Sequence, residues 1–261
     1  MKLLLINPNI SESVSQLIAA EARRSAAPGT DIEVLTAPSG VAYIETRFEA
    51  LLGAHATAEL AAQHHEGADA VIVAAFGDPG LMALREVLPC PVTGLTEAAL
   101  ASACLLGQRF SIVAISQRIR AWYAETVHAY GLSSRLASIR GLDESLLDIG
   151  NVQGNQGERL VELAGRCVAE DGADVIVLAG APLAGLARSL EGRIPVPMVD
   201  GVSSAVRHAE TLVRMKAGLA RAGSFSAPPA KAHQGLTPAV AALLAKAQAQ
   251  RAPGAVSRLS R

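Results

Sequence analysis

Residues 67–81 read GADAVIVAAFGDPGL, and residues 172–186 read GADVIVLAGAPLAGL. The two stretches align without a gap at an offset of 105 residues (174 minus 69), and each is a β-branched run that ends in a glycine-containing turn. Each stretch is followed by a short amphipathic segment, a proline-flanked strand and an alanine-rich helical run. The chain therefore consists of two copies of one unit.

Short β-branched runs alternate along the chain with longer Ala-, Leu- and charge-rich segments, which is the pattern of repeated βαβ units and a parallel sheet. Strands are expected near residues 2–7, 31–36, 70–75, 91–94, 110–115, 136–140, 174–179 and 196–199. Helices are expected near residues 11–26, 49–66, 79–88, 96–107, 117–130, 156–171, 183–191, 201–222 and 236–250. Ligands of open parallel sheets bind beyond the carboxyl ends of the strands. The predicted fold is therefore α/β, with two pseudosymmetric lobes of parallel sheet and a ligand cleft between them.

Three parts of the chain follow from this pattern. Residues 1–100 form the first lobe, to which residues 201–222 return, and residues 101–210 form the second. Residues 223–261 form a basic extension, because no Asp or Glu follows Glu210. A loose or oligomer-packing segment is the favoured interpretation of this extension, since exposed termini are commonly loose. A polyanion-binding tail is the alternative.

Composition excludes several functional classes. The chain has 261 residues, of which 50% are apolar, and its formal net charge of −1 gives no electrostatic footprint for nucleic acid. No stretch approaches the roughly 20 apolar residues that a membrane span requires. The N-terminus passes directly into a strand and is too short in apolar residues for a signal peptide. Three cysteines, none in a CxxC pair, predict neither a disulfide framework nor a metal site. We expect a cytoplasmic protein.

Turn residues at the strand ends carry two interpretations. Ser11 is expected to cap the first helix, and the free N–H groups there, with the Asn9 amide, could bind a carboxylate or imide oxygen. Ordinary turn chemistry explains these residues equally well. Asp78 before Pro79 is interpreted as a helix N-cap in preference to a catalytic acid. Asp200 is open to the same two interpretations.

Seven collinear segments resemble the hydantoin and allantoin racemase branch of the aspartate/glutamate racemase superfamily. They are Ile6–Asn9, Tyr43–Glu45, Phe76–Leu81, Gly94–Ala99, Phe110–Val113, Ala181–Leu186 and Asp200–Val202, within residues 1 to about 215. The resemblance implies a two-lobed, cofactor-independent enzyme and a homo-oligomer. It also implies a small carboxylate, hydantoin or ureide as substrate, with reaction at a carbon acid next to a carboxylate or carbonyl.

The chain departs from this family where the family keeps its chemistry. Such racemases carry one cysteine at each of two pseudosymmetric strand ends, and the matching positions here are Ala75 and Gly180. Neither side chain can hold a proton, so a two-thiol mechanism cannot operate. The other cysteines are interpreted as structural: Cys90 at the amino end of a strand, Cys104 and Cys167 in apolar helical runs.

Two functional classes remain. The first is an isomerase-type enzyme without the thiol pair, or a lyase or decarboxylase in which a Glu, Asp, His or Tyr transfers the proton. Glu45 is the preferred catalytic residue, although a surface carboxylate is an equally open interpretation. The second class is a protein that binds a small carboxylate or ureide without turnover. We expect Ala75 and Gly180 to face each other across one cleft. The expected substrate-binding residues are Asn9, Ser11, Phe76, Gly77, Asp78, Ser116, Ala181, Pro182 and Asp200.

Overall fold

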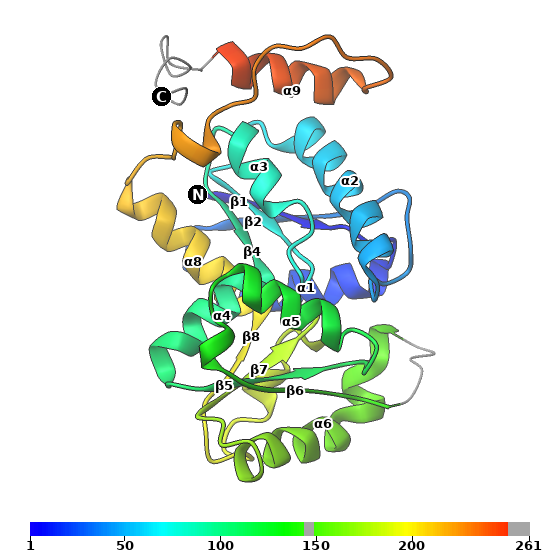
Figure 1. Ribbon diagram of the computed structural model, residues 1–261, viewed down its shortest axis with the longest axis vertical. Helices are drawn as coiled ribbons and strands as arrows, with labels where there is room; N and C mark the ends of the chain where they lie inside the picture. Colours follow the sequence, from blue (N-terminus) through cyan, green and yellow to red (C-terminus); the bar gives the residue numbers. More distant parts are fainter. Residues whose placement is uncertain (144–148, 250–261) are drawn as a thin grey trace.

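Two four-stranded parallel sheets, stacked one above the other, form the protein (Figure 1). The computed structural model describes residues 1–143 and 149–249. The first sheet has the order β2-β1-β3-β4 and the second the order β6-β5-β7-β8. The two orders are the same when the second set of four strands is superposed on the first. The α/β fold of two pseudosymmetric lobes is thereby confirmed.

The first lobe contains β1 (Lys2–Asn7), α1 (Glu12–Ser25), β2 (Asp31–Thr36), α2 (Arg47–His64), β3 (Ala70–Val73), α3 (Leu81–Val87), β4 (Val92–Gly94) and α4 (Leu95–Leu106). The second contains β5 (Phe110–Ala114), α5 (Arg120–Ala129), β6 (Leu136–Gly141), α6 (Val152–Ala169), β7 (Val175–Ala179), α7 (Leu186–Ser189), β8 (Met198–Asp200) and α8 (Gly201–Met215). Helix α9 (Pro238–Ala249) follows. Short 3-10 helices cover Ser133–Arg135, Ile149–Asn151, Ala181–Leu183 and Gly223–Phe225.

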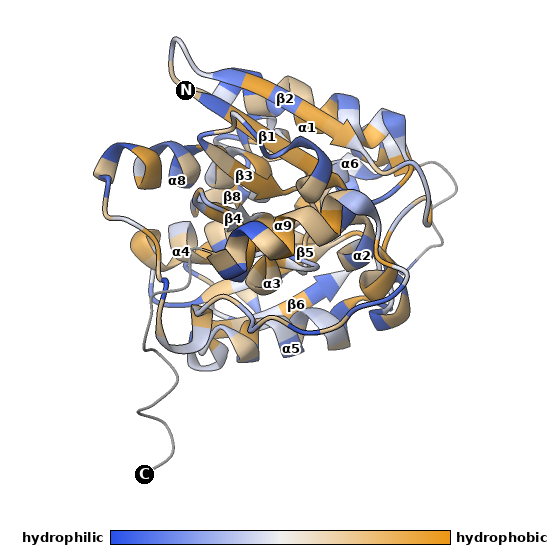
Figure 2. Ribbon diagram, turned by 90° about the horizontal axis from the view of Figure 1, so that it is seen from above, coloured by the Kyte–Doolittle hydropathy of each residue, from blue (hydrophilic) through white to orange (hydrophobic). Residues whose placement is uncertain are grey.

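Burial on both faces explains why the central strands are continuous apolar runs. In β1, Leu3 and Leu5 face a core that extends between the two sheets, while Leu4 and Ile6 face the outer core under α2 and α3. In β7, Val177 belongs to the same inner core, and the next residue, Leu178, faces the outer core of the second lobe. The inner core is therefore one continuous layer shared by both lobes. Figure 2 shows apolar strands at the centre of the molecule.

Helix α8 returns from the second sheet to the first, where it packs against α1, β3 and β4. Its buried Glu210 accepts hydrogen bonds from the Ala27 N–H at 2.9 Å and from the Thr30 hydroxyl at 2.6 Å. The helix ends at Met215, seven residues before the expected end, because Lys216 adopts a left-handed conformation with φ of 50°.

Helix α9 packs against α2 and α3 of its own chain, with Leu243 in the outer core of the first lobe. Residues 238–249 are thus an ordered helix packed on the first lobe and not a loose segment, while a role in oligomer packing stays a prediction. The end of the basic tail, residues 250–261, lies outside the described residues. The homo-oligomer stays a prediction.

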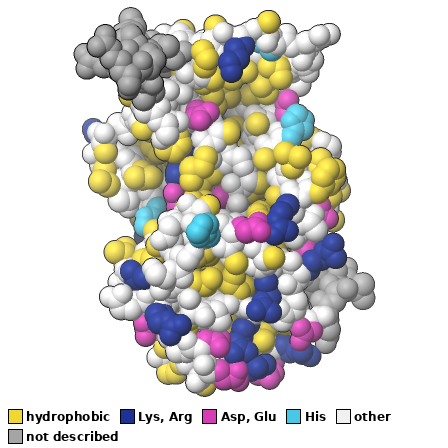
Figure 3. Space-filling view, viewed as in Figure 1, with side chains coloured by type: hydrophobic (Ala, Val, Ile, Leu, Met, Phe, Trp, Pro, Cys, Tyr) yellow, Lys and Arg dark blue, Asp and Glu magenta, His cyan; other side chains and the backbone are white. Residues whose placement is uncertain are grey.

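Surface composition differs between the lobes. Figure 3 shows most of the charged side chains on this face over the second lobe, and mainly hydrophobic and uncharged ones over the first. Exposed Phe48 and Leu51 of α2 contribute to this difference. In the part of the chain that the structure describes, no helix is long and apolar enough to cross a membrane.

Candidate active site

The two repeated turns meet at one small cavity between the lobes. Ala75 follows β3 and Gly180 follows β7, and both line this cavity, as the sequence repeat predicts. The cavity is lined by Asn9, Tyr43, Ile44, Ala75, Phe76, Ile115, Ile119, Tyr123, Gly180, Ala181 and Pro182. Its volume of about 30 Å³ has room for roughly two water molecules. A larger ligand can therefore enter only when the walls separate.

The side chains around the cavity are uncharged, and three of them carry polar groups. Asn9 Oδ1 accepts from the Ser11 N–H at 2.9 Å and from Asn7 Nδ2 at 3.1 Å. The amino group of the Asn9 side chain is therefore the part that can donate to a ligand. Burial raises the pKa of both Tyr43 and Tyr123. Both hydroxyls therefore stay protonated at neutral pH, and that of Tyr123 can donate to a ligand oxygen.

Glu45 lies beside the cavity and is linked to it through Tyr43. The Ser116 hydroxyl donates to Glu45 Oε1, and the hydrogen bond of Tyr43 to Glu45 contributes to the raised pKa of Tyr43. A capping box at the start of α2 fixes this loop, because Glu49 Oε2 accepts from the N–H groups of Glu45 and Thr46 at 2.8 Å. Glu45 and Ser116 come from different lobes, so their contact joins the two sides of the cleft.

The turn backbones supply further donors, and one of them has a backbone conformation that favours glycine. Among the described residues, the N–H groups of Phe76 and Ala181 have no acceptor. Gly180 has φ of 115°, which L side chains rarely adopt, although a Cβ there would lie 3.6 Å from its nearest neighbour. Backbone conformation, rather than lack of space, therefore favours glycine at position 180.

Aromatic residues of α5 hold the first turn. The Phe76 and Tyr123 rings lie 4.7 Å apart at an angle of 52°. Trp122 packs so closely on Gly77 that a Cβ there would lie 2.2 Å from the indole ring. Gly77 itself lines no part of the cavity and donates its N–H to Thr96 Oγ1. The glycine is thus required by a close side-chain contact.

The interpretation of Asp78 as the N-cap of the following helix is wrong. Gly80, with φ of 86°, occupies the N-cap position of α3, and the helix begins at Leu81. The Asp78 carboxylate instead accepts the N–H groups of Thr96 and Glu97, both at 2.8 Å, in the first turn of α4. These donors belong to the helix that follows β4, the strand next to β3.

The remaining predicted residues lie outside the cavity lining. Ser11 caps α1 by accepting the Val14 N–H, as predicted, and Asp200, for which the sequence left two interpretations open, caps α8 by accepting the Ser203 N–H at 2.9 Å. Asp200 lines a separate cavity of about 350 Å³ in the second lobe, together with Arg188. The structure thus gathers Asn9, Ala75, Phe76, Gly180, Ala181 and Pro182 at the cavity, with Glu45 and Ser116 beside it.

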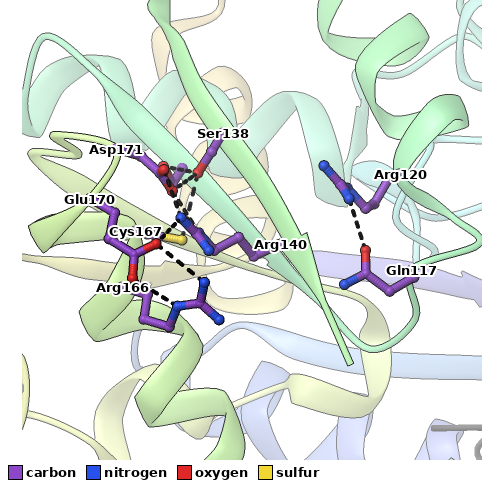
Figure 4. Close-up of polar contacts among 9 residues, drawn as sticks. Gln117, Arg120, Ser138, Arg140, Arg166, Cys167, Glu170 and Asp171 are labelled. Atoms are coloured by element: carbon purple, nitrogen blue, oxygen red, sulfur yellow. Dashed lines mark hydrogen bonds and ion pairs between the residues drawn. The ribbon is translucent and has the colours of Figure 1, made fainter. Parts of the chain in front are cut away.

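The three cysteines are free and lie away from the cavity. Burial raises the pKa of Cys90, which precedes β4, to about 11. Cys167 in α6 is fully buried beside Ser138, whose hydroxyl lies 2.6 Å from Asp171 Oδ2, in a network that ties β6 to the end of α6 (Figure 4). Burial also raises the pKa of Cys167. Neither Cys90 nor Cys167 is an activated thiolate.

Five cavity residues are absent from the predicted site: Tyr43, Ile44, Ile115, Ile119 and Tyr123. Ile44, Ile115 and Ile119 form apolar walls, and Tyr123 contributes the second hydroxyl. Tyr123 has no local signal, because it lies inside a helix, and its counterpart at the repeat offset is Ile18, a core residue of α1. Tyr43 belongs to a segment that was recognised, but its hydroxyl was given no role.

Comparison with known proteins gives consistent matches. The model of a family described as Asp/Glu/Hydantoin racemase matches residues 3–209. Hydantoin racemase from Paenarthrobacter aurescens is 37% identical over 88% of this chain and 99% of its own. Hydantoin racemase from Pseudomonas sp. (strain NS671) is 34% identical over 90% and 95%. The solved structure of allantoin racemase from Klebsiella pneumoniae has a TM-score of 0.87 at 35% identity, covering 92% of this chain and 98% of that one.

Proposed function

Because the chain belongs to the Asp/Glu/hydantoin racemase family, we propose that it is a cofactor-independent isomerase-type enzyme acting on a small hydantoin-like or ureide carbon acid. One observation carries the proposal: both repeated turns open onto a single cavity with uncharged walls and two protonated tyrosine hydroxyls. Such walls suit a neutral ring better than a charged amino acid. The three free cysteines favour a reducing compartment such as the cytoplasm.

The cavity supplies donors for the charge that develops in the reaction. A hydantoin-like ring loses the proton of a carbon that lies between a nitrogen and a carbonyl group, and the charge moves onto the carbonyl oxygen. The hydroxyl of Tyr123 and the N–H groups of Phe76 and Ala181 are the donors available to that oxygen. Donors fixed in place before the reaction stabilise the enolate at little reorganisation cost.

Glu45 is the proposed base. The Ser116 hydroxyl orients its carboxylate, and Tyr43 or one water molecule in the cavity would connect it to the substrate. Ala75 and Gly180 carry no proton donor, so no second group of the thiol kind stands on the opposite face. Glu45 would then remove the proton, and inversion would require a water molecule to protonate the planar enolate from the opposite face. Deuterium exchange should consequently be faster than inversion of configuration.

A proton-exchange experiment tests this function. Wild-type protein is incubated in D2O with allantoin and with 5-substituted hydantoins, and loss of the C–H signal is followed by NMR. We expect Glu45→Gln to lower the exchange rate at least about 100-fold, the usual scale for loss of a general base. Glu158→Gln is the matched control, because that side chain is 82% exposed in α6 and pairs with Arg193. An unchanged rate in Glu45→Gln would exclude this carboxylate as the base.

A second variant tests the independence from thiols. The triple change Cys90→Ala, Cys104→Ala and Cys167→Ala should keep the full exchange rate, because all three residues lie outside the cavity. Loss of exchange in a folded triple variant would contradict the proposed mechanism.

Binding without turnover is the second candidate, favoured by the lack of any proton-carrying side chain at Ala75 and Gly180. It predicts that hydantoins or allantoin bind in calorimetry while the wild type gives no exchange. A lyase or decarboxylase would instead consume the starting compound in the same spectra. If the protein neither bound nor converted any of these compounds, both candidates would be contradicted.

A further inference from the structure

The carboxylate of Asp78 lies in a buried hydrogen-bonding site where three elements of secondary structure meet, and this site is called the seat below. Its Oδ1 accepts the Thr96 N–H, and its Oδ2 accepts the Glu97 N–H at 2.8 Å and the Tyr130 hydroxyl at 2.6 Å. Asp78 is 6% exposed. Position 94 must be glycine, because a Cβ on Gly94 would lie 2.3 Å from the Asp78 carboxyl carbon. The seat therefore joins the turn after β3 to the start of α4 and the end of α5.

The same turn forms one wall of the cavity. Phe76 lines it and stacks on Tyr123, and Gly77 packs against Trp122. Both aromatic residues belong to α5, the helix that ends at the Tyr130 cap. Asp78 thus holds this wall from its far side, without contact with the cavity itself.

We propose that Asp78 is a positioning residue of the cleft: its carboxylate holds Phe76 and Gly77 against α5, and protonation of that carboxylate changes how tightly they are held. The proposal rests on the proposed function only in treating the cavity as the ligand site. The coupling between the seat and the wall is a property of the free protein.

The electrostatics of the seat give the direction of the effect. Burial raises the pKa of Asp78 to about 6, although hydrogen bonds from Tyr130 and two backbone groups oppose the rise. The other ionisable groups facing it are Glu97 of α4, Arg85 of α3 and Tyr123 of α5. A released, solvated aspartate has a pKa of about 3.9. Because the seated carboxyl has the higher pKa, protonation favours the seated state, and the seat loses stability as the pH rises through about 6.

Trp122 is a built-in reporter of this coupling, since it is the single tryptophan of the chain and contacts Gly77. We expect its emission, measured without ligand from pH 4.5 to 8.5, to shift to longer wavelength with a midpoint near pH 6. Asp78→Asn should abolish the transition. The control His128→Gln, which removes an exposed titratable side chain in α5, should keep it. Persistence of the transition in folded Asp78→Asn would overturn the proposal.

Two neighbours should move the midpoint in opposite directions. Tyr130→Phe removes a hydrogen bond that lowers the pKa of Asp78, so the midpoint should rise. Glu97→Gln removes a negative charge that raises this pKa, so the midpoint should fall. We expect shifts of at least about half a pH unit. If Asp78→Asn does not fold, these opposite shifts decide the matter, and shifts of one sign or none overturn the proposal. No substrate is added, so a protein inactive on hydantoins would leave this test unaffected.

Discussion

The turns at residues 75–81 and 180–186 have similar sequences and similar paths but different anchors. Each ends in a left-handed glycine at the start of a helix, Gly80 with φ of 86° and Gly185 with φ of 78°. The first turn is anchored by the buried carboxylate of Asp78. The second has Leu183 at the equivalent position, and its carbonyl groups at 182 and 184 accept from Gln153 of α6 at 2.8 and 2.9 Å.

This difference shows what a sequence repeat determines and what it leaves open. The repeat dictates where each strand ends and where each helix begins, because these depend on local backbone conformation. The anchor depends on what the neighbouring helix offers: two N–H groups of α4 in the first lobe, one amide side chain of α6 in the second. The first turn is thereby coupled to a carboxyl group whose pKa burial raises to about 6.

Removing each anchor should give the largest contrast. Asp78→Ala leaves two N–H groups and the Tyr130 hydroxyl unpaired in a buried site, so we expect a loss of about 3 kcal/mol in the free energy of unfolding. Gln153→Ala should cost about 1 kcal/mol, because this side chain is partly exposed and water can replace it at the two carbonyls. Urea titrations at pH 7 measure both. Equal losses would contradict the assignment of different anchors.

The left-handed glycines should come next. Gly185→Ala adds a Cβ 2.7 Å from Oε2 of buried Glu21, whose other oxygen, Oε1, accepts from Ser25 and Arg188, and we expect a cost of about 2–3 kcal/mol. Gly80→Ala meets nothing closer than 3.4 Å and should cost about 1 kcal/mol, the backbone strain alone.

A double-mutant cycle separates the two contributions at Gly185. In a Glu21→Ala background the cost of Gly185→Ala should fall to about 1 kcal/mol, because only the strain of the left-handed backbone remains. Identical costs with and without Glu21 would show that the clash is not what requires this glycine.

The smallest structural effects are expected at the cavity itself. Ala75→Cys extends an existing side chain and should change stability by less than about 1 kcal/mol. Gly180→Cys should cost about 1–2 kcal/mol, since φ of 115° is strained for any L residue while space for the Cβ exists. Thermal unfolding compares them.

The double variant with both cysteines tests the chemistry of the cleft. If it folds cooperatively, we expect it to exchange deuterium on both faces of a hydantoin and so to racemise it, because the two thiols would stand on the two turns that meet at the cavity. A folded double variant with two accessible thiols and no exchange would show that the binding groups no longer suit such substrates.

Much of the fold could be predicted from the chain, because the central strands are continuous apolar runs. The caps at Ser11 and Asp200 are local too, since each accepts an N–H group three residues further along the chain. Long-range partners could not be predicted. Asp78 followed by proline is typical of a helix start, but its carboxylate binds donors 18 and 19 residues away. The helix expected at 183–191 shortens to Leu186–Ser189, preceded by a 3-10 turn that contains Pro182.

The candidate site likewise has residues that the sequence could place and residues that it could not. Ala75 and Gly180 could be placed at one cavity because the repeat makes their strands end at equivalent depths. Tyr123 could not, because its approach to Phe76 depends on how α5 lies across the boundary between the lobes. A loop motif predicts Glu45 as the catalytic residue, but its contact with Ser116 cannot be predicted, because it forms only when both lobes are assembled.

The return of α8 to the first sheet also determines the order in which the protein can be completed on the ribosome. Lobe 1 contains the first strands to be synthesised, yet the helix that covers β3 and β4 and binds the Ala27–Thr30 turn through Glu210 ends at Met215. The apolar face beneath it must stay uncovered while about a hundred further residues are added, a period in which chaperones commonly bind exposed surface. All four strands of the first sheet have been made at Gly94, but their covering helix α8 is made only after β8, the last strand of the second sheet. The half that is made first is thus covered only when the second half has been made.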